Sequence, residues 1–144
     1  MKKNTIGSWI TLNNPSIAEI MSDCGFDWLC IDMEHSIIDY SEAQLLIATI
    51  QSKGIQAFVR VGENNNRIIK RVLDAGADGI IIPMVNNKEE AIKAINSVKY
   101  PPVGKRGVGL ARAQDYGFGF DNYKNNIAGN IKLIVQVEHI DAIS

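Results

Sequence analysis

The sequence predicts an α/β fold of the TIM-barrel, (β/α)8 class, and two observations support this prediction. First, short apolar segments alternate with amphipathic segments along the chain, with roughly 22–27 residues from one strand to the next. This alternation is typical of right-handed βαβ units that share a parallel sheet. Second, the chain lacks the Gly-x-Gly-x-x-Gly and Gly-Lys-Ser/Thr phosphate loops of nucleotide-binding doubly wound sheets. A barrel therefore fits the pattern better.

The first βα unit opens with an apolar run and continues into a capped helix. Residues 6–10 predict the strand, and residues 15–24 predict the helix that follows it. Asn14 is suited to cap this helix, and Pro15 is favoured at its first position. Gly25 is expected to end it.

The second unit combines a buried strand with a longer amphipathic helix. Residues 28–32 predict the strand and residues 41–53 the helix, with Ser41 as its cap and Gly54 after its last turn. Glycines and prolines mark residues 99–130 as mostly loop. The same pattern predicts further strands over 55–61, 79–83 and 131–137 and further helices over 66–75 and 88–98.

Chain length limits how much of a barrel can form. The chain has 144 residues, whereas an eight-stranded barrel needs about 200 residues or more. We therefore expect a single domain over residues 1–144 with about five βα units, which corresponds to the N-terminal part of a barrel, as a fragment or as a natural truncation. Because five strands cannot close, two sheet edges and an apolar inner face should be exposed.

Composition disfavours several classes of partner. The net charge is −1, which gives no indication of nucleic acid or an anionic membrane surface as a partner. The sequence has no 18-residue apolar run and no signal-peptide pattern. Cys24 and Cys30 are its only cysteines, and both fit buried positions. A reducing, cytoplasmic location is the simplest interpretation.

The end of the second predicted strand carries the strongest indication of chemistry. Asp32, Glu34 and His35 follow an apolar run at the point where the strand opens into its loop. Barrel enzymes display catalytic side chains at this end of their strands. The alternative is an acidic, solvated loop.

Arg60 lies at the end of an otherwise apolar strand, which is costly unless the guanidinium meets an anion. Its planar fork suits a carboxylate ligand. A structural ion pair with Asp32 or Glu34 is the alternative.

Three further residues and one loop are candidates for a site. Gln136 and Glu138 share one face of the fifth strand, which favours ligand or metal binding over a core position. Asp74 lies near the C-terminal end of a helix, where an anion is unfavourable, so we expect a cationic partner such as an imidazolium. The glycines of residues 104–109 allow close backbone approach to a ligand, although a mobile surface loop is equally compatible with them.

These residues lie in stretches that resemble the HpcH/HpaI aldolase family, the class II 2-oxo acid aldolases that include 4-hydroxy-2-oxoheptanedioate aldolase. The resemblance runs in order along essentially the whole chain. The matching stretches are residues 25–35, 59–61, 72–85, 100–102, 104–109, 112–113 and 135–138.

The resemblance implies a metal-dependent aldolase that cleaves or forms a 4-hydroxy-2-oxo acid from pyruvate and an aldehyde. By position, His35 resembles the catalytic base, and Asp74 resembles the carboxylate that raises its basicity. Arg60 resembles the residue that stabilises the enolate, Gln136 a pyruvate contact and Glu138 a metal ligand. The implied cofactor is Mg²⁺, Mn²⁺ or Co²⁺. The implied partners are the small-molecule 2-oxo acid and aldehyde, and a homo-oligomer is implied for the full-length parent.

One departure from the family pattern affects the expected activity. The family's second carboxylate ligand belongs to a Gly-Pro-x-Asp-Leu type segment that has no counterpart here. A metal held by Glu138 alone would bind weakly, so we expect little or no activity from this polypeptide by itself. The alternatives are a non-catalytic truncated barrel fragment that needs a complementary partner, and a related lyase acting on an acyl-thioester.

Overall fold

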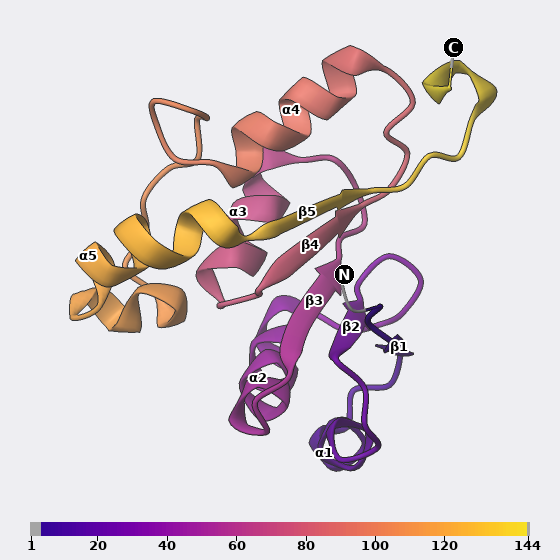
Figure 1. The fold of residues 1–144 in the computed structure, drawn as a ribbon, viewed down its shortest axis with the longest axis vertical. Helices are drawn as coiled ribbons and strands as arrows, with labels where there is room; N and C mark the ends of the chain where they lie inside the picture. Colours follow the sequence, from indigo (N-terminus) through magenta and orange to yellow (C-terminus); the bar gives the residue numbers. More distant parts are fainter. Residues whose placement is uncertain (1–3, 144) are drawn as a thin grey trace.

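The chain forms a curved, open parallel sheet whose helices lie on one face (Figure 1). The computed structural model describes residues 4–143. Its strands are hydrogen-bonded in chain order, β1-β2-β3-β4-β5, and every neighbouring pair is parallel. This order is the winding of a barrel, because a doubly wound sheet reverses its strand order and places helices on both faces.

The elements alternate as predicted, and most of their ends differ from the predicted bounds by a few residues. Among the described helices, none is long and apolar enough to cross a membrane. The strands are β1 (Gly7–Ile10), β2 (Trp28–Asp32), β3 (Gln56–Arg60), β4 (Gly79–Ile82) and β5 (Lys132–Val135). The longer helices are α1 (Pro15–Ser22), α2 (Tyr40–Ser52), α3 (Asn66–Asp74) and α4 (Lys88–Val98).

Side-chain caps explain where two of the helices begin. The side chain of Asn14 accepts a hydrogen bond from the Ser16 backbone N–H at 2.9 Å, which confirms it as the cap of α1. The prediction for α2 is wrong, because its cap is Asp39 rather than Ser41. Asp39 accepts from the Glu42 N–H at 3.0 Å, and the Glu42 carboxylate accepts from the Asp39 N–H at 2.7 Å. This reciprocal capping box starts the helix at the residue after Asp39.

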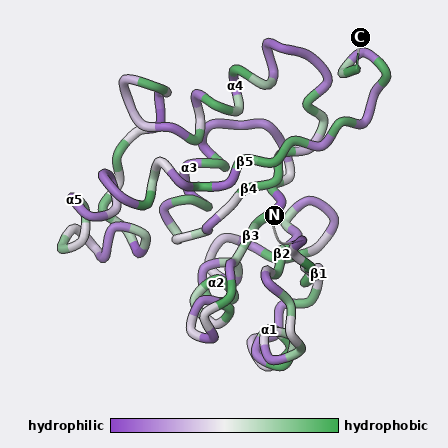
Figure 2. Tube along the Cα trace, viewed as in Figure 1, coloured by the Kyte–Doolittle hydropathy of each residue, from purple (hydrophilic) through white to green (hydrophobic). Residues whose placement is uncertain are grey.

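The two faces of the sheet are packed differently, and apolar residues occupy much of each strand (Figure 2). The outer face lies against the helices and is fully buried; it includes Leu29, Ile31, Ala57, Val59, Ile80 and Ile82. On the inner face, Cys30, Phe58 and Ile81 form a smaller cluster. Trp9 and Ile134, also on the inner side, remain 42% and 40% exposed. Within residues 4–143, the two predicted open edges, β1 and β5, are confirmed, whereas the inner face is exposed only toward these edges and is buried at its centre.

Two further expectations need correction. Residues 99–130 are not mostly loop, because they contain several helical turns: η1 (Arg112–Gly117), α5 (Phe120–Asn122), η2 (Tyr123–Ile127) and η3 (Ala128–Asn130). Gln114 and Tyr123 in this segment are buried, so their turns pack against the barrel wall. Cys24 is exposed rather than buried because it lies beyond the end of α1, whereas Cys30 is buried as expected.

Candidate functional site at the C-terminal ends of the strands

Asp32 and Arg60 form the centre of the site. They end β2 and β3 and are direct cross-strand partners. Arg60 Nε donates to Asp32 Oδ1 at 2.9 Å, and Arg60 Nη2 donates to Asp32 Oδ2 at 2.7 Å. The structural ion pair that the sequence left open is thus present, as a bidentate fork. The fork fixes the guanidinium along one edge and leaves Nη1 directed elsewhere.

The fork keeps both of its members charged. Burial opposes ionisation of Asp32, which is only 2% exposed. The hydrogen bonds from Arg60 and from two backbone N–H groups outweigh that effect, so the pKa of Asp32 lies below its usual value. The same bonds with Asp32 raise the pKa of Arg60 above its usual value. The site therefore has a permanent guanidinium charge near neutral pH.

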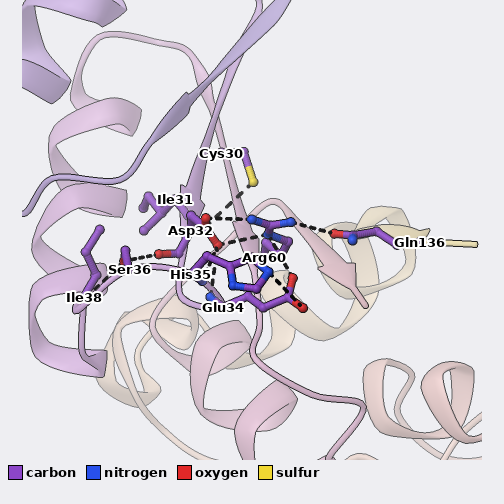
Figure 3. Close-up of polar contacts among 9 residues, drawn as sticks. All are labelled: Cys30, Ile31, Asp32, Glu34, His35, Ser36, Ile38, Arg60 and Gln136. Carbon is purple, nitrogen blue, oxygen red and sulfur yellow. Dashed lines mark hydrogen bonds and ion pairs between the residues drawn. The ribbon is translucent and has the colours of Figure 1, made fainter. Parts of the chain in front are cut away.

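The loop after β2 wraps around Asp32 and carries His35 to the mouth of the sheet (Figure 3). Asp32 Oδ1 also accepts from the backbone N–H groups of Glu34 at 3.0 Å and His35 at 3.3 Å. The Ser36 hydroxyl donates to the Asp32 carbonyl. These bonds orient a short loop that would otherwise be free to move. The loop's position follows directly from the buried carboxylate at the end of β2.

Glu34 lies between the imidazole and the guanidinium. Its Oε2 is 3.2 Å from Arg60 Nε, and its Oε1 is 3.7 Å from His35 Nε2. The Glu34 side chain is mostly buried, whereas that of His35 is 72% exposed. His35 is therefore accessible to a ligand at the mouth while remaining next to Arg60.

Gln136 and Glu138 reach the same end of the sheet from the far strand. Gln136 Oε1 accepts from Arg60 Nη1 at 3.4 Å (Figure 3). Glu138 Oε2 accepts from the backbone N–H of Met84 at 2.8 Å, in the loop that follows β4. Met84 has a positive φ of 54°, which is uncommon for a side chain of this size. Three of the predicted residues, His35, Arg60 and Gln136, are thus brought together, and Glu138 follows Gln136 by two residues and bonds to the loop after β4.

Asp74 lies at the other end of the sheet. It ends α3, which runs antiparallel to the strands, and so it precedes the start of β4. Its Oδ1 accepts from Arg106 Nη2 at 2.7 Å and from Gln114 Nε2 at 3.3 Å. The cationic partner of Asp74 in this chain is therefore a guanidinium, not the expected imidazolium. Within residues 4–143, no hydrogen bond or ion pair joins Asp74 to His35.

The carboxylates of the described chain do not make a complete metal site. Within residues 4–143, no group of three or more His, Cys, Asp or Glu side chains is placed to hold a metal ion. Glu138 offers one carboxylate, and one of its oxygens is already bonded to Met84. Glu34 has a buried Oε2 without a hydrogen-bond partner, but that oxygen lies beside Arg60, whose positive charge disfavours a cation there. The predicted metal role of Glu138 is therefore not met by these residues alone.

Sequence reasoning missed residues that contact the predicted ones. The ring of Trp9, on β1, lies over the Arg60 guanidinium with 4.7 Å from its centroid to Cζ. Arg106, within the predicted loop of residues 104–109, is 1% exposed and is the partner of Asp74. Strand parity places Trp9 on the inner face, but its stacking on a residue two strands away depends on sheet curvature.

Comparison with known proteins identifies the family that the sequence resembles. The model of the HpcH/HpaI aldolase/citrate lyase family matches residues 5–144. A hydroxypyruvate/pyruvate aldolase of Sagittula stellata is 41% identical over 140 residues, which are 96% of this chain and 55% of that protein. A 5-keto-4-deoxy-D-glucarate aldolase of Escherichia coli is 38% identical over 150 residues, covering 99% of this chain and 58% of that protein.

Solved structures share the fold. The crystal structure of an HpcH/HpaI aldolase/citrate lyase family protein from Burkholderia cenocepacia superposes with a TM-score of 0.91 at 31% identity. The match covers 98% of this chain and 57% of that one. The chain thus spans about half the length of the curated relatives and solved structures it matches.

Proposed function

Because the chain belongs to the HpcH/HpaI aldolase/citrate lyase family, we propose that it carries part of the active site of a pyruvate aldolase. The reaction is cleavage or formation of a 4-hydroxy-2-oxo acid from pyruvate and an aldehyde. Relatives named as hydroxypyruvate/pyruvate and 2-keto-3-deoxy-L-rhamnonate aldolases support carbon–carbon lyase chemistry on a 2-oxo acid. The observation that carries the proposal is the Arg60 fork, which leaves Nη1 outside the ion pair with Asp32, in a long 3.4 Å hydrogen bond to Gln136 and near the exposed His35.

Arg60 is suited to stabilise the charge that develops during carbon–carbon cleavage. When the C3–C4 bond breaks, its electron pair passes into the C2 carbonyl and makes an enolate oxygen. A fixed guanidinium that donates to this oxygen lowers the barrier without reorganising, because Asp32 already holds it in place. In the proposed complex, Gln136 contacts the 2-oxo acid beside Nη1 and orients it.

His35 is suited to take the proton from the C4 hydroxyl as the new aldehyde forms. Its imidazole is exposed at the mouth and lies next to Glu34, which also approaches Arg60. A histidine exchanges protons readily near neutral pH. In the aldol direction the same group returns the proton to the newly formed alkoxide, so the residue serves both directions.

The contacts within this chain do not account for the predicted roles of the metal and of Asp74. Dependence on Mg²⁺, Mn²⁺ or Co²⁺, with Glu138 as a ligand, remains a prediction, and the roles of Arg60 and His35 are derived without it. Asp74 and His35 lie at opposite ends of the sheet, which a five-residue strand separates by about 16 Å. For Asp74 to raise the basicity of His35, as the resemblance implies, that His35 would have to belong to another copy of the chain. The predicted homo-oligomer would then be part of the site.

The open sheet favours one alternative, a barrel part that is inactive until a complementary part joins it. Trp9 and Ile134 are partly exposed on the inner side, and no strand of the described residues pairs with the outer edges of β1 and β5. Aldolase activity is measured for the chain alone and for a longer version that completes the barrel. If only the longer version is active, the chain is a barrel part that needs its complement. If both are inactive, the aldolase function itself is contradicted.

The decisive assay is deuterium exchange into the methyl group of pyruvate, followed by NMR with added Mn²⁺. In the active form, His35→Ala should slow aldol cleavage far more than it weakens pyruvate binding. Arg60→Lys should reduce turnover by about 10²- to 10³-fold, because a point charge cannot replace the fork. His139→Ala and Arg67→Lys are matched controls at exposed positions and should leave activity unchanged. Near-normal turnover in Arg60→Lys would rule out the enolate role.

A further inference from the structure

We propose that Trp9 is a positioning residue that orients the Arg60 guanidinium for the 2-oxo acid. The effect on 2-oxo acid binding rests on the proposed function, whereas the contact between Trp9 and Arg60 does not depend on it. The Trp9 ring lies over Arg60 with 4.7 Å between the ring centroid and Cζ. At this distance the electron-rich face of an indole attracts a guanidinium.

Strand register explains how two residues from different strands meet. Trp9 on β1 is the cross-strand partner of Cys30 on β2, and Cys30 is the partner of Phe58 on β3. Arg60 lies two residues beyond Phe58, so its side chain points to the same inner face. Cys30 between them is small and fully buried, which leaves room above it for the indole and the guanidinium to stack.

The ring supplies a constraint that the Asp32 fork lacks. Two parallel hydrogen bonds along one edge fix the direction of the guanidinium but still permit it to tilt about the line of those bonds. A ring lying over the guanidinium opposes that tilt. Nη1 is then presented to the mouth, where its protein contact is the long bond to Gln136 at 3.4 Å. With Asp32 on one edge of the guanidinium and Trp9 over one face, an oxyanion can approach Arg60 at Nη1.

Trp28 shows what an ordinary inner-face tryptophan does in this sheet. Its ring stacks on Phe58 with centroids 5.4 Å apart and planes 16° apart, and it packs against the inner cluster. Trp9 instead is 42% exposed and has a cation under its ring. If Trp9 merely covered apolar surface, leucine would replace it well. If it acts through its π face, phenylalanine would replace it better than leucine.

The first test measures Arg60 without any ligand. The NMR signal of the Arg60 Nε–H is followed in the wild type, Trp9→Phe and Trp9→Leu, with Arg60→Lys used to assign it. We expect its hydrogen exchange to accelerate roughly tenfold in Trp9→Leu and much less in Trp9→Phe. Trp28→Phe is the control and should leave the signal unchanged. Equal exchange in Trp9→Leu and the wild type would overturn the proposal.

A shape-conserving series covers the case in which Trp9→Leu does not fold. Fluorinated tryptophans are incorporated at position 9 in the Trp28→Phe background, so that the ring keeps its shape while its face loses negative charge. We expect Arg60 Nε–H exchange to rise with each added fluorine. The absence of a trend would show that the π face is not what holds the guanidinium.

Oxalate, a planar dianion with the geometry of a pyruvate enolate, separates this inference from the proposed function. By calorimetry, we expect oxalate binding to be roughly tenfold weaker in Trp9→Leu, with Trp9→Phe close to the wild type. If oxalate binds to none of the proteins while the Nε–H signals differ, the proposed 2-oxo acid site does not form in this chain and the positioning role stands. If oxalate binds the wild type and both variants equally, Trp9 has no such role.

Discussion

The buried Asp74–Arg106 pair provides a prediction whose size follows from the structure. Asp74→Ala removes the carboxylate that accepts from Arg106 Nη2 at 2.7 Å and from Gln114 Nε2 at 3.3 Å. Arg106 is almost fully buried, and among residues 4–143 its guanidinium then keeps one hydrogen-bond partner, the Tyr123 hydroxyl at 3.0 Å. The variant therefore leaves a buried positive charge without a counter-charge.

Removing one member of a buried pair typically costs about 3–5 kcal/mol. The Asp74 side chain is slightly exposed, so water can partly replace it, and we expect a loss near the lower limit, about 3 kcal/mol. Replacing both members, as Asp74→Ala with Arg106→Met, should recover at least about 1 kcal/mol, because no unpaired charge then remains. The coupling between the two changes is the quantity that identifies the ion pair.

Urea unfolding followed by far-UV circular dichroism measures these differences. Asp121→Ala, at an exposed position on α5, is the control and should change stability by less than about 0.5 kcal/mol. Two results would refute the reasoning. One is a loss below about 1 kcal/mol in Asp74→Ala, and the other is a double variant that is less stable than Asp74→Ala alone.

Three further predictions concern titration, thiol chemistry and metal binding. The pKa of Asp32 is lower in the folded chain than in the unfolded one. Its contribution to stability is therefore present above about pH 4 and is lost as the pH falls toward the folded pKa. In urea unfolding at a series of pH values, Asp32→Asn should make the free energy of unfolding less dependent on pH in this range. Burial raises the pKa of Cys30 to about 12, so a thiol reagent at pH 8 should modify Cys24 alone in the native chain and both cysteines after unfolding. Glu138 by itself should hold Mn²⁺ with a Kd weaker than about 1 mM, and a micromolar Kd measured by water proton relaxation, abolished by Glu138→Gln, would reveal ligands that the present contacts do not show.

The central residues of the site could be predicted from the sequence because parallel strands align their carboxyl ends. Asp32, Arg60 and Gln136 each lie at or just after the end of an apolar run, and parallel pairing in chain order brings those ends to one edge. His35 follows because the loop after β2 is short and bonded to Asp32. Local signals of this kind need only the alternation of strands and helices.

The cap of α2 shows where local reasoning falls short. Asp39 and Ser41 are both good capping residues, and the choice depends on which one Glu42 can reach. Cys24 shows the same limit, because a single residue beyond a helix end is buried or exposed according to what packs against it.

By itself, the sequence determined the alternation of strands and helices, the parallel sheet and the meeting of His35, Arg60 and Gln136 at one edge, because these follow from periodicity and strand ends. Only the tertiary structure decided that Asp74 binds Arg106, which lies 32 residues further along the chain, and that Trp9 stacks on Arg60. Both contacts depend on how the sheet curves and on the path of a long connecting segment. No short stretch of sequence encodes these two features.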